Sequence, residues 1–183
     1  MIIYIMSTSV CTKLNYCRYM IGSGVGNISN SDRTALNRRA SYCCCNKVRY
    51  IKVFFDPPID GTIQISQLAV YSKCINIAPN GTPSALNTYG FDTSANYPID
   101  GTLEARAFPF IYQSYEPSNF GYWLLDLGQE FFVDKIVYYN RSDSNSDRAN
   151  GMLIASYGKN FPNNSVPLKQ FILNSDLIQT FNF

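Results

Sequence analysis

The sequence predicts an all-β fold that occupies most of the chain. The aromatic content is high, with 14 Tyr and 12 Phe among 183 residues, and aromatic side chains favour strands. Trp123, Leu125 and Leu127 occupy alternate positions, which is the period of a half-buried strand. Short apolar runs are separated by segments rich in Gly, Pro, Asn and Asp, as β-strands commonly are.

The chain divides into a basic, cysteine-containing N-terminal arm, residues 1–47, and a sandwich domain, residues 48–183. Residues 1–46 carry five basic side chains and one acidic side chain, a charge of +4, against +2 for the whole chain. A basic, polar arm on a nearly neutral domain predicts an extended segment that binds a partner. The small net charge argues against nucleic-acid binding by the sandwich itself.

The cysteines and the apolar segments indicate the cellular compartment in which the protein is expected. Five of the six cysteines lie in the arm and Cys43–Cys45 are consecutive, which favours reduced thiols, with a zinc site in the arm as the alternative. No run approaches the ~20 apolar residues of a membrane span. Met1–Met6 is apolar but short and lacks a preceding basic region, so we expect neither a signal peptide nor a membrane span.

Each strand of the sandwich is predicted from its own stretch of sequence. The first alternates in pattern and ends at Asp56-Pro57-Pro58, because proline interrupts strand pairing. Gly128 is expected to end the strand that contains Trp123. Asn140–Asn150 is polar and charged, so we expect a loop outside the core. The predicted strands are Val48–Phe55, Ile63–Tyr71, Tyr122–Leu127, Phe132–Tyr139, Gly151–Tyr157 and Ser165–Leu173, with a long aromatic loop at Ala105–Phe120.

Three motifs in this order resemble the discoidin family, a galactose-binding-like jelly-roll β-sandwich. They are W-x-L-D-L-G at 123–128, K-I-V-Y-Y-N-R-x-D at 135–143 and D-R-x-x-G at 147–151. Val48–Phe55 with Ile63–Tyr71 is similar to the hairpin that ends family members, but here it comes first. The resemblance therefore implies a circularly permuted strand order, in which Gln179–Phe183 pairs antiparallel with Arg49–Phe54.

The segment Pro98–Thr102 resembles the calcium-binding turn of lectin-like family members. The resemblance implies that calcium binds the Asp100 carboxylate and the carbonyls of Tyr97 and Thr102, with Ser114 as a further oxygen ligand. The glutamate that the family adds near its C-terminus has no match here. The alternative is a β-turn in which Asp100 bonds to its own backbone.

Arg141 and Arg148 stand seven residues apart, as do the two arginines that clasp the sugar in fucose-binding members. The family's histidine is absent, and Ser144 and Asn145 replace its vicinal cysteines. The alternative, which we prefer, is a self-satisfied loop in which Asp143 and Asp147 pair with the arginines. Trp123 is expected in the core rather than as a sugar-stacking platform.

The residue types present exclude several kinds of catalysis. Without histidine there is no Ser-His-Asp or Cys-His arrangement, and no phosphate-binding glycine motif stands between a strand and a helix. Carboxylates for glycoside hydrolysis would have to include Glu104 and Glu116, so we expect a non-catalytic protein.

The resemblance extends to discoidin-like modules of large DNA viruses. It implies a structural or interaction protein, a minor capsid or other virion component, found in the virion or host cytoplasm with other capsid or assembly proteins as partners. The alternative is a carbohydrate-binding lectin module that binds a glycan with Arg141 and Arg148, with calcium as the candidate cofactor.

Overall fold

The computed structural model describes residues 47–57, 61–90, 93–115, 121–163 and 166–183. The predicted N-terminal arm, with its cysteines, lies outside the described residues. All strand pairs in the described part are antiparallel, which confirms the all-β prediction. The strands are β1 (Lys47–Phe54), β2 (Gln64–Ile65), β3 (Gln67–Ser72), β4 (Ile75–Asn76), β5 (Thr82–Leu86), β6 (Tyr112–Gln113), β7 (Tyr122–Phe132), β8 (Lys135–Tyr139), β9 (Leu153–Tyr157), β10 (Lys169–Ile172) and β11 (Ile178–Asn182).

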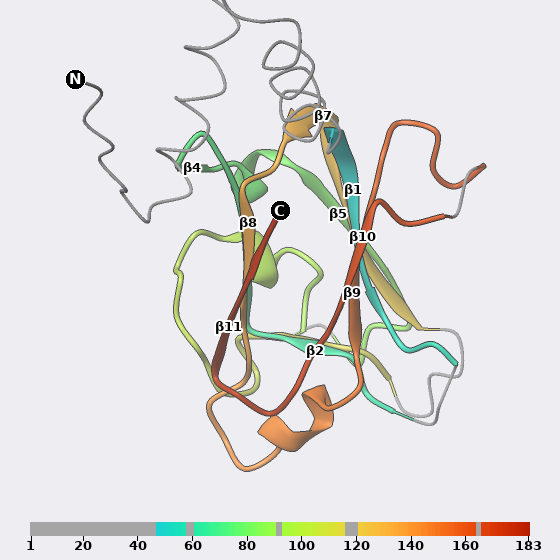
Figure 1. The fold of residues 1–183 in the computed structure, drawn as a ribbon. Helices are drawn as coiled ribbons and strands as arrows, with labels where there is room; N and C mark the ends of the chain where they lie inside the picture. The colour runs from blue at the N-terminus through green and yellow to red at the C-terminus, as the bar shows by residue number, and fades with distance from the viewer. Residues whose placement is uncertain (1–46, 58–60, 91–92, 116–120, 164–165) are drawn as a thin grey trace, which may run out of the picture. The chain divides into compact units, whose positions relative to one another are not determined.

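The strands form two main sheets and a short two-stranded ribbon (Figure 1). The five-stranded sheet has the order β10-β9-β1-β7-β5, and the four-stranded sheet has the order β11-β8-β3-β4. The ribbon pairs β2 with β6, and Gln64 Nε2 of β2 donates to the Asn145 carbonyl in the loop that follows β8. Three short 3-10 helices complete the described part: η1 (Ala78–Asn80), η2 (Tyr97–Ile99) and η3 (Ser146–Ala149).

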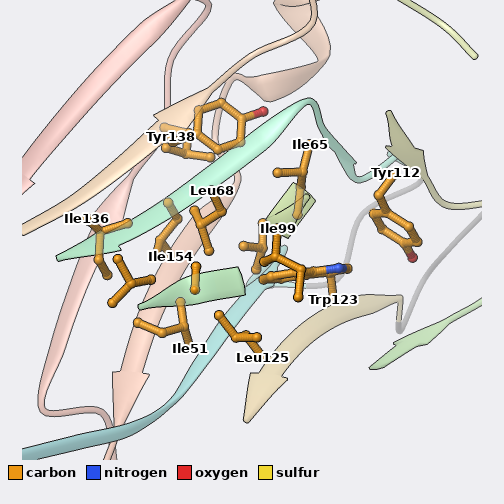
Figure 2. Packing of buried hydrophobic residues seen from close by; sticks show 14 of the residues in the cluster. Ile51, Ile65, Leu68, Ile99, Tyr112, Trp123, Leu125, Ile136, Tyr138 and Ile154 are labelled. Carbon is orange, nitrogen blue, oxygen red and sulfur yellow. The ribbon is translucent and has the colours of Figure 1, made fainter. Parts of the chain in front are cut away.

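The hydrophobic core lies between the two main sheets (Figure 2). Ile51 of β1 and Leu125 of β7 are fully buried, as are Leu68 of β3 and Ile136 of β8 on the other side. Each such side chain contributes about 1.5–3 kcal/mol by leaving water. Trp123 is fully buried as predicted, and its Nε1 donates to the Ala95 carbonyl at 2.9 Å, so the indole belongs to the core.

The predicted pairing of the C-terminal strand with β1 is wrong. β11 pairs with β8, with Thr180 opposite Val137. β1 cannot accept another strand, because β7 and β9 occupy its two edges. Nor does β1 form a hairpin with the predicted strand Ile63–Tyr71, since that stretch breaks at Ser66 into β2 and β3, and neither belongs to the five-stranded sheet.

Gly128 does not end its strand, as the sequence had led us to expect. β7 continues to Phe132, and its register with β1 shifts between Val48 and Tyr50. Gly128 has φ +78°, a conformation that glycine adopts without strain. Its N–H donates to Asp126 Oδ1 at 2.8 Å, so the aspartate of the W-x-L-D-L-G motif holds the irregularity in place.

Asp126 of β7 also forms a bidentate ion pair with Arg49 of β1. The Nε–Oδ1 and Nη2–Oδ2 distances are 2.9 and 3.0 Å. The hydrogen bond to Arg49 is the main reason that the pKa of Asp126 lies below its ordinary value, although burial opposes it. The pair therefore fastens the sheet where its ladder is irregular.

Two further expectations concern cysteines and membranes. Cys74, in the turn between β3 and β4, is disulfide-bonded, so the prediction that all cysteines are reduced is wrong for this residue. Among the residues described, no helix has the length and apolar character needed to span a bilayer.

Candidate functional site

The predicted calcium turn begins at η2 and is closed by hydrogen bonds to the side chain of Asp100. Tyr97 begins the 3-10 turn, Pro98 is its second residue and Asp100 follows its end. Gly101 has φ +89°, which suits a residue without Cβ. Asp100 Oδ1 accepts hydrogen bonds from the backbone N–H and the hydroxyl of Thr102, at 3.0 and 2.6 Å. The alternative predicted for this segment, an aspartate bonded to its own backbone, is therefore present.

A guanidinium lies against the oxygens that the resemblance assigns to calcium. Arg106 Nη1 donates to Asp100 Oδ2 at 2.7 Å, and Nη2 donates to the Tyr97 carbonyl at 3.1 Å. Gln67 Nε2 donates to the same carbonyl at 2.8 Å and also to the Asp100 carboxylate. A calcium ion would have to replace these donors, because it needs six to eight oxygen ligands of its own.

The environment of Asp100 favours its charged form. Burial raises the pKa of this carboxyl, but the hydrogen bonds from Thr102 and the contact with Arg106 outweigh burial, so the pKa lies below its ordinary value. A carboxylate that is charged and paired with a cation holds the turn without a metal.

Ser114, the fourth predicted calcium ligand, is bound elsewhere. Its Oγ accepts the Ile63 N–H at 2.9 Å, and its own N–H donates to the Ile63 carbonyl at 2.8 Å. Within the described ranges, no group of three or more acidic, Cys or His side chains is arranged to hold a metal. The calcium site stays a prediction, and the cation that Asp100 contacts in this structure is the guanidinium of Arg106.

Arg141 is the buried centre of the charged loop between β8 and β9. Its side chain is only 5% exposed. Nε and Nη2 donate to the two carboxylate oxygens of Asp143, which is the pairing predicted for a self-satisfied loop. Nη1 donates to the side-chain oxygens of Gln64 on β2, at 3.0 Å, and Gln113 on β6, at 3.3 Å. Little of this guanidinium remains to clasp a sugar.

The loop is therefore not wholly outside the core, which corrects the expectation from its polarity. Asn140, Arg141 and Ala149 are all buried. Asn140 Nδ2 donates to the Ser146 carbonyl at 2.8 Å, and the hydroxyl of buried Tyr138 donates to the Gln64 carbonyl at 2.8 Å. Polar residues can lie inside a protein when each is hydrogen-bonded, as these are.

Arg148 has a different position from Arg141. It belongs to η3 and is half-buried, and its backbone N–H donates to the Asn145 carbonyl at 3.3 Å. Asp147, its predicted partner, has an exposed side chain. The two arginines of the motif thus differ in burial, and their joint sugar-binding role stays a prediction.

Hydrogen bonds join the Asp100 turn and the Arg141 loop into one structure, which we call the clamped loop end. Ser142 N–H donates to the Arg106 carbonyl at 3.0 Å, and Phe108 N–H donates to Asp143 Oδ2 at 3.3 Å. Arg106 N–H donates to Ser66 Oγ at 2.6 Å, at the break between β2 and β3. Two arginine–aspartate pairs therefore position both loops on the sheet scaffold.

Sequence reasoning missed four of the residues that build the clamped loop end: Gln64, Gln67, Gln113 and Arg106. The only signal was the presence of glutamines within otherwise apolar strand segments, as in Ile63-Gln64-Ile65. A buried amide in such a place needs a partner, and that need pointed to a polar network beneath the loops.

Exposed aromatic side chains lie beside the clamped loop end. Tyr89, Phe108, Phe110 and Tyr115 are all exposed, and we call them the aromatic patch. The Tyr89 ring centroid lies 6.1 Å from those of both Phe108 and Tyr115. Exposed apolar groups that gather in this way mark surfaces of interaction.

The chain can be classified from its fold and from the geometry of its loops, because comparison with known proteins gave no match. No family model, no curated protein and no solved structure matches the chain. The class that the described residues define is an antiparallel all-β protein with two main sheets, whose loops are held by arginine–aspartate pairs in which the arginine is the more buried partner.

Proposed function

We propose that this chain is a non-catalytic structural or interaction module. The observation that carries the proposal is the burial of Arg141, whose guanidinium bonds to Asp143, Gln64 and Gln113 rather than to the surface. The most conspicuous polar motif thus stabilises the loop, whereas large apolar side chains remain exposed. That distribution suits a protein that binds other proteins through apolar surfaces.

We further propose a discoidin-like jelly roll in permuted strand order, acting as a minor capsid or other virion component of a large DNA virus. The support is the order of the three motifs between Trp123 and Gly151. The permuted order rests on the likeness of Val48–Phe55 and Ile63–Tyr71 to the hairpin that ends family members, because β11 pairs with β8 and not with β1. Other capsid or assembly proteins would be the partners, in the virion or the host cytoplasm.

The test uses the protein from its native source. Sedimentation should place it in a large particle, and cross-linking mass spectrometry should join its lysines to other proteins of that particle. Lys52, Lys135 and Lys159 lie on different parts of the described fold and serve as reporters. Recovery only as a free protein, with cross-links confined to its own chain, would reject the virion role.

A carbohydrate-binding module is the second candidate, and the aromatic patch is the observation that favours it. Tyr89 and Tyr115 present nearly parallel rings, with an interplanar angle of 26°, and aromatic faces stack on apolar faces of sugars. A glycan array, run with calcium and with chelator, tests it. Binding that survives in wild type but is lost in both Tyr89→Ala and Arg148→Ala would support this candidate, and an array without signal would reject it.

A further inference from the structure

Strand β11 lies at the edge of the four-stranded sheet, and one side of its backbone has no partner strand among the residues described. The Asn140 N–H donates to the Leu177 carbonyl at 2.8 Å, and the Phe183 N–H donates to the Asp134 carbonyl at 2.9 Å. Residues that bond to a given neighbour alternate along an antiparallel strand, so the odd-numbered residues of β11 bond to β8. The residues whose N–H and C=O groups point to the open side are Ile178, Thr180 and Asn182.

The other edges of the two main sheets carry features that discourage strand pairing. β5 contains Pro83, β10 contains Lys169, and β4 has only 2 residues. Proteins protect edge strands with prolines, lysines and short length. β11 has neither a proline nor a charged side chain, and Ile178 at its start is 58% exposed. An unprotected edge of this kind can accept another strand.

Half-buried aromatic rings lie at the same edge. Phe181 stacks on Phe171 of β10, with ring centroids 4.8 Å apart, and the Phe183 centroid lies 5.7 Å from that of Phe171. Phe181 and Phe183 pack against the core, but neither is fully buried. Lys169 Nζ donates to the Asn182 carbonyl at 3.2 Å, and a carbonyl oxygen can accept a second hydrogen bond. A strand added beside β11 would remove more of these rings from water.

We propose that β11 pairs antiparallel with β11 of a second copy of this chain, about a two-fold axis at Thr180. In this register Thr180 lies opposite its own counterpart, and Ile178 lies opposite Asn182 of the other copy. All three outward-directed residues of each strand then take part, which gives roughly six hydrogen bonds. A shift of the register by two residues would leave one of the three unpaired in each strand. Each copy contributes the same surface, as a two-fold interface requires.

A second copy fits this edge better than an unrelated extended peptide does. β11 of the second copy is already held in strand conformation by β8, so its backbone loses little conformational freedom on binding. No like charges come to lie opposite each other, because β11 is uncharged. Thr180 pairs with Thr180, a favourable cross-strand pair, and the Phe181 rings of the two copies become diagonal neighbours, which is within reach of aromatic side chains.

The experiment is sedimentation equilibrium of the full chain with two charged variants at the axis. Thr180→Lys and Thr180→Glu, each alone, place like charges opposite each other and should weaken association at least about tenfold. Mixing the two variants should restore a dimer, because Lys then lies opposite Glu. Thr82→Lys is the matched control and should leave the dimer intact, since Thr82 is also exposed but lies on β5 of the other sheet. A wild-type monomer at ~100 μM, or a mixture that stays monomeric, would overturn the proposal.

Thr180→Pro tests whether the backbone of β11 is the contact. The Thr180 N–H points away from β8, so proline removes a bond to the second copy and none to β8, and edge strands tolerate proline in this position. The variant should be a folded monomer, which a circular dichroism melting curve confirms. Exchange of the wild-type Thr180 amide hydrogen should slow as the protein concentration rises. A dimer that persists in Thr180→Pro would reject this interface, and if that variant is unfolded, the Thr180→Lys and Thr180→Glu mixture decides.

The dimer proposal goes beyond the proposed function and fails independently of it. A monomer that co-sediments with virions would reject the dimer alone. A dimer that is absent from virions would reject the virion role alone.

Discussion

Replacing Arg141 by Met should destabilise the sandwich strongly, because this guanidinium joins three parts of the fold. Methionine keeps much of the length and the apolar stem of arginine but none of its donors. Gln64 and Gln113 would keep their buried side-chain oxygens without the donor that now reaches them. Asp143 is partly exposed and would turn to water.

The magnitude follows from these groups. A buried acceptor without a partner costs about 1–3 kcal/mol, and two such acceptors arise here. The partly exposed Asp143 carboxylate can be solvated by water, so its loss of the arginine adds less than the two buried acceptors do. We therefore expect the free energy of unfolding to fall by about 3–5 kcal/mol, a large share of the roughly 5–15 kcal/mol of an ordinary domain.

Urea unfolding followed by tryptophan fluorescence measures this loss, since the single Trp123 lies in the core. Arg49→Met is the matched control, because Arg49 forms the same fork with Asp126 but with a side chain 33% exposed to solvent. Its loss should be clearly smaller than that of Arg141→Met. A change below about 1 kcal/mol for Arg141→Met would refute the clamp that we assign to it.

The same variant has a pH signature. The hydrogen bond to Arg141 lowers the pKa of Asp143, although burial opposes it. Because the folded pKa lies below the unfolded value near 3.8, this pair stabilises the fold above that pH and loses its contribution as pH falls through the folded pKa. Arg141→Met should therefore lose stability at neutral pH and show a weaker decline in acid than wild type.

Three more predictions follow from contacts elsewhere. Gly81→Ala should destabilise by about 1–3 kcal/mol, since its Cβ would lie 2.6 Å from Leu125 Cδ1, whereas Gly90→Ala meets nothing within 4 Å; equal melting temperatures would contradict this. Asp100→Ala should lower the melting temperature equally in calcium and in chelator, because Arg106 holds the turn, and a loss confined to calcium buffer would instead establish a metal site. Deleting Gln179–Phe183 removes most of β11 from the four-stranded sheet and should unfold the domain, and an unchanged melting curve would contradict that pairing.

Sequence periodicity predicted the strands whose two faces differ. Trp123, Leu125 and Leu127 of β7 are buried, and their sequence neighbours are less buried. One face of this strand therefore packs in the core and the other is nearer to solvent. β9 is buried at every position, and its apolar composition sufficed to identify it. Local patterns of this kind arise from burial, so they reveal which segments are strands.

Strand partners and buried polar residues could not be predicted in the same way. The pairing of β11 with β8 depends on which edges are free, and that is a property of the whole sheet. Arg141 sits in a segment whose polarity indicated solvent, and its burial depends on Gln64 and Gln113, which are distant in sequence. A resemblance supplied the location of both candidate sites but not the partners of their side chains.

The central position of β1 has a consequence for how the chain folds. Ile51 finds its neighbours only at Leu125 and Ser156, so the first strand of the five-stranded sheet waits for segments synthesised much later. Such long-range pairing slows folding and leaves an apolar strand without partners during synthesis. Emergence of Tyr157 from the ribosome is thus the earliest point at which β1 has both neighbours, and until then its alternating apolar stretch lacks the strands that bury it.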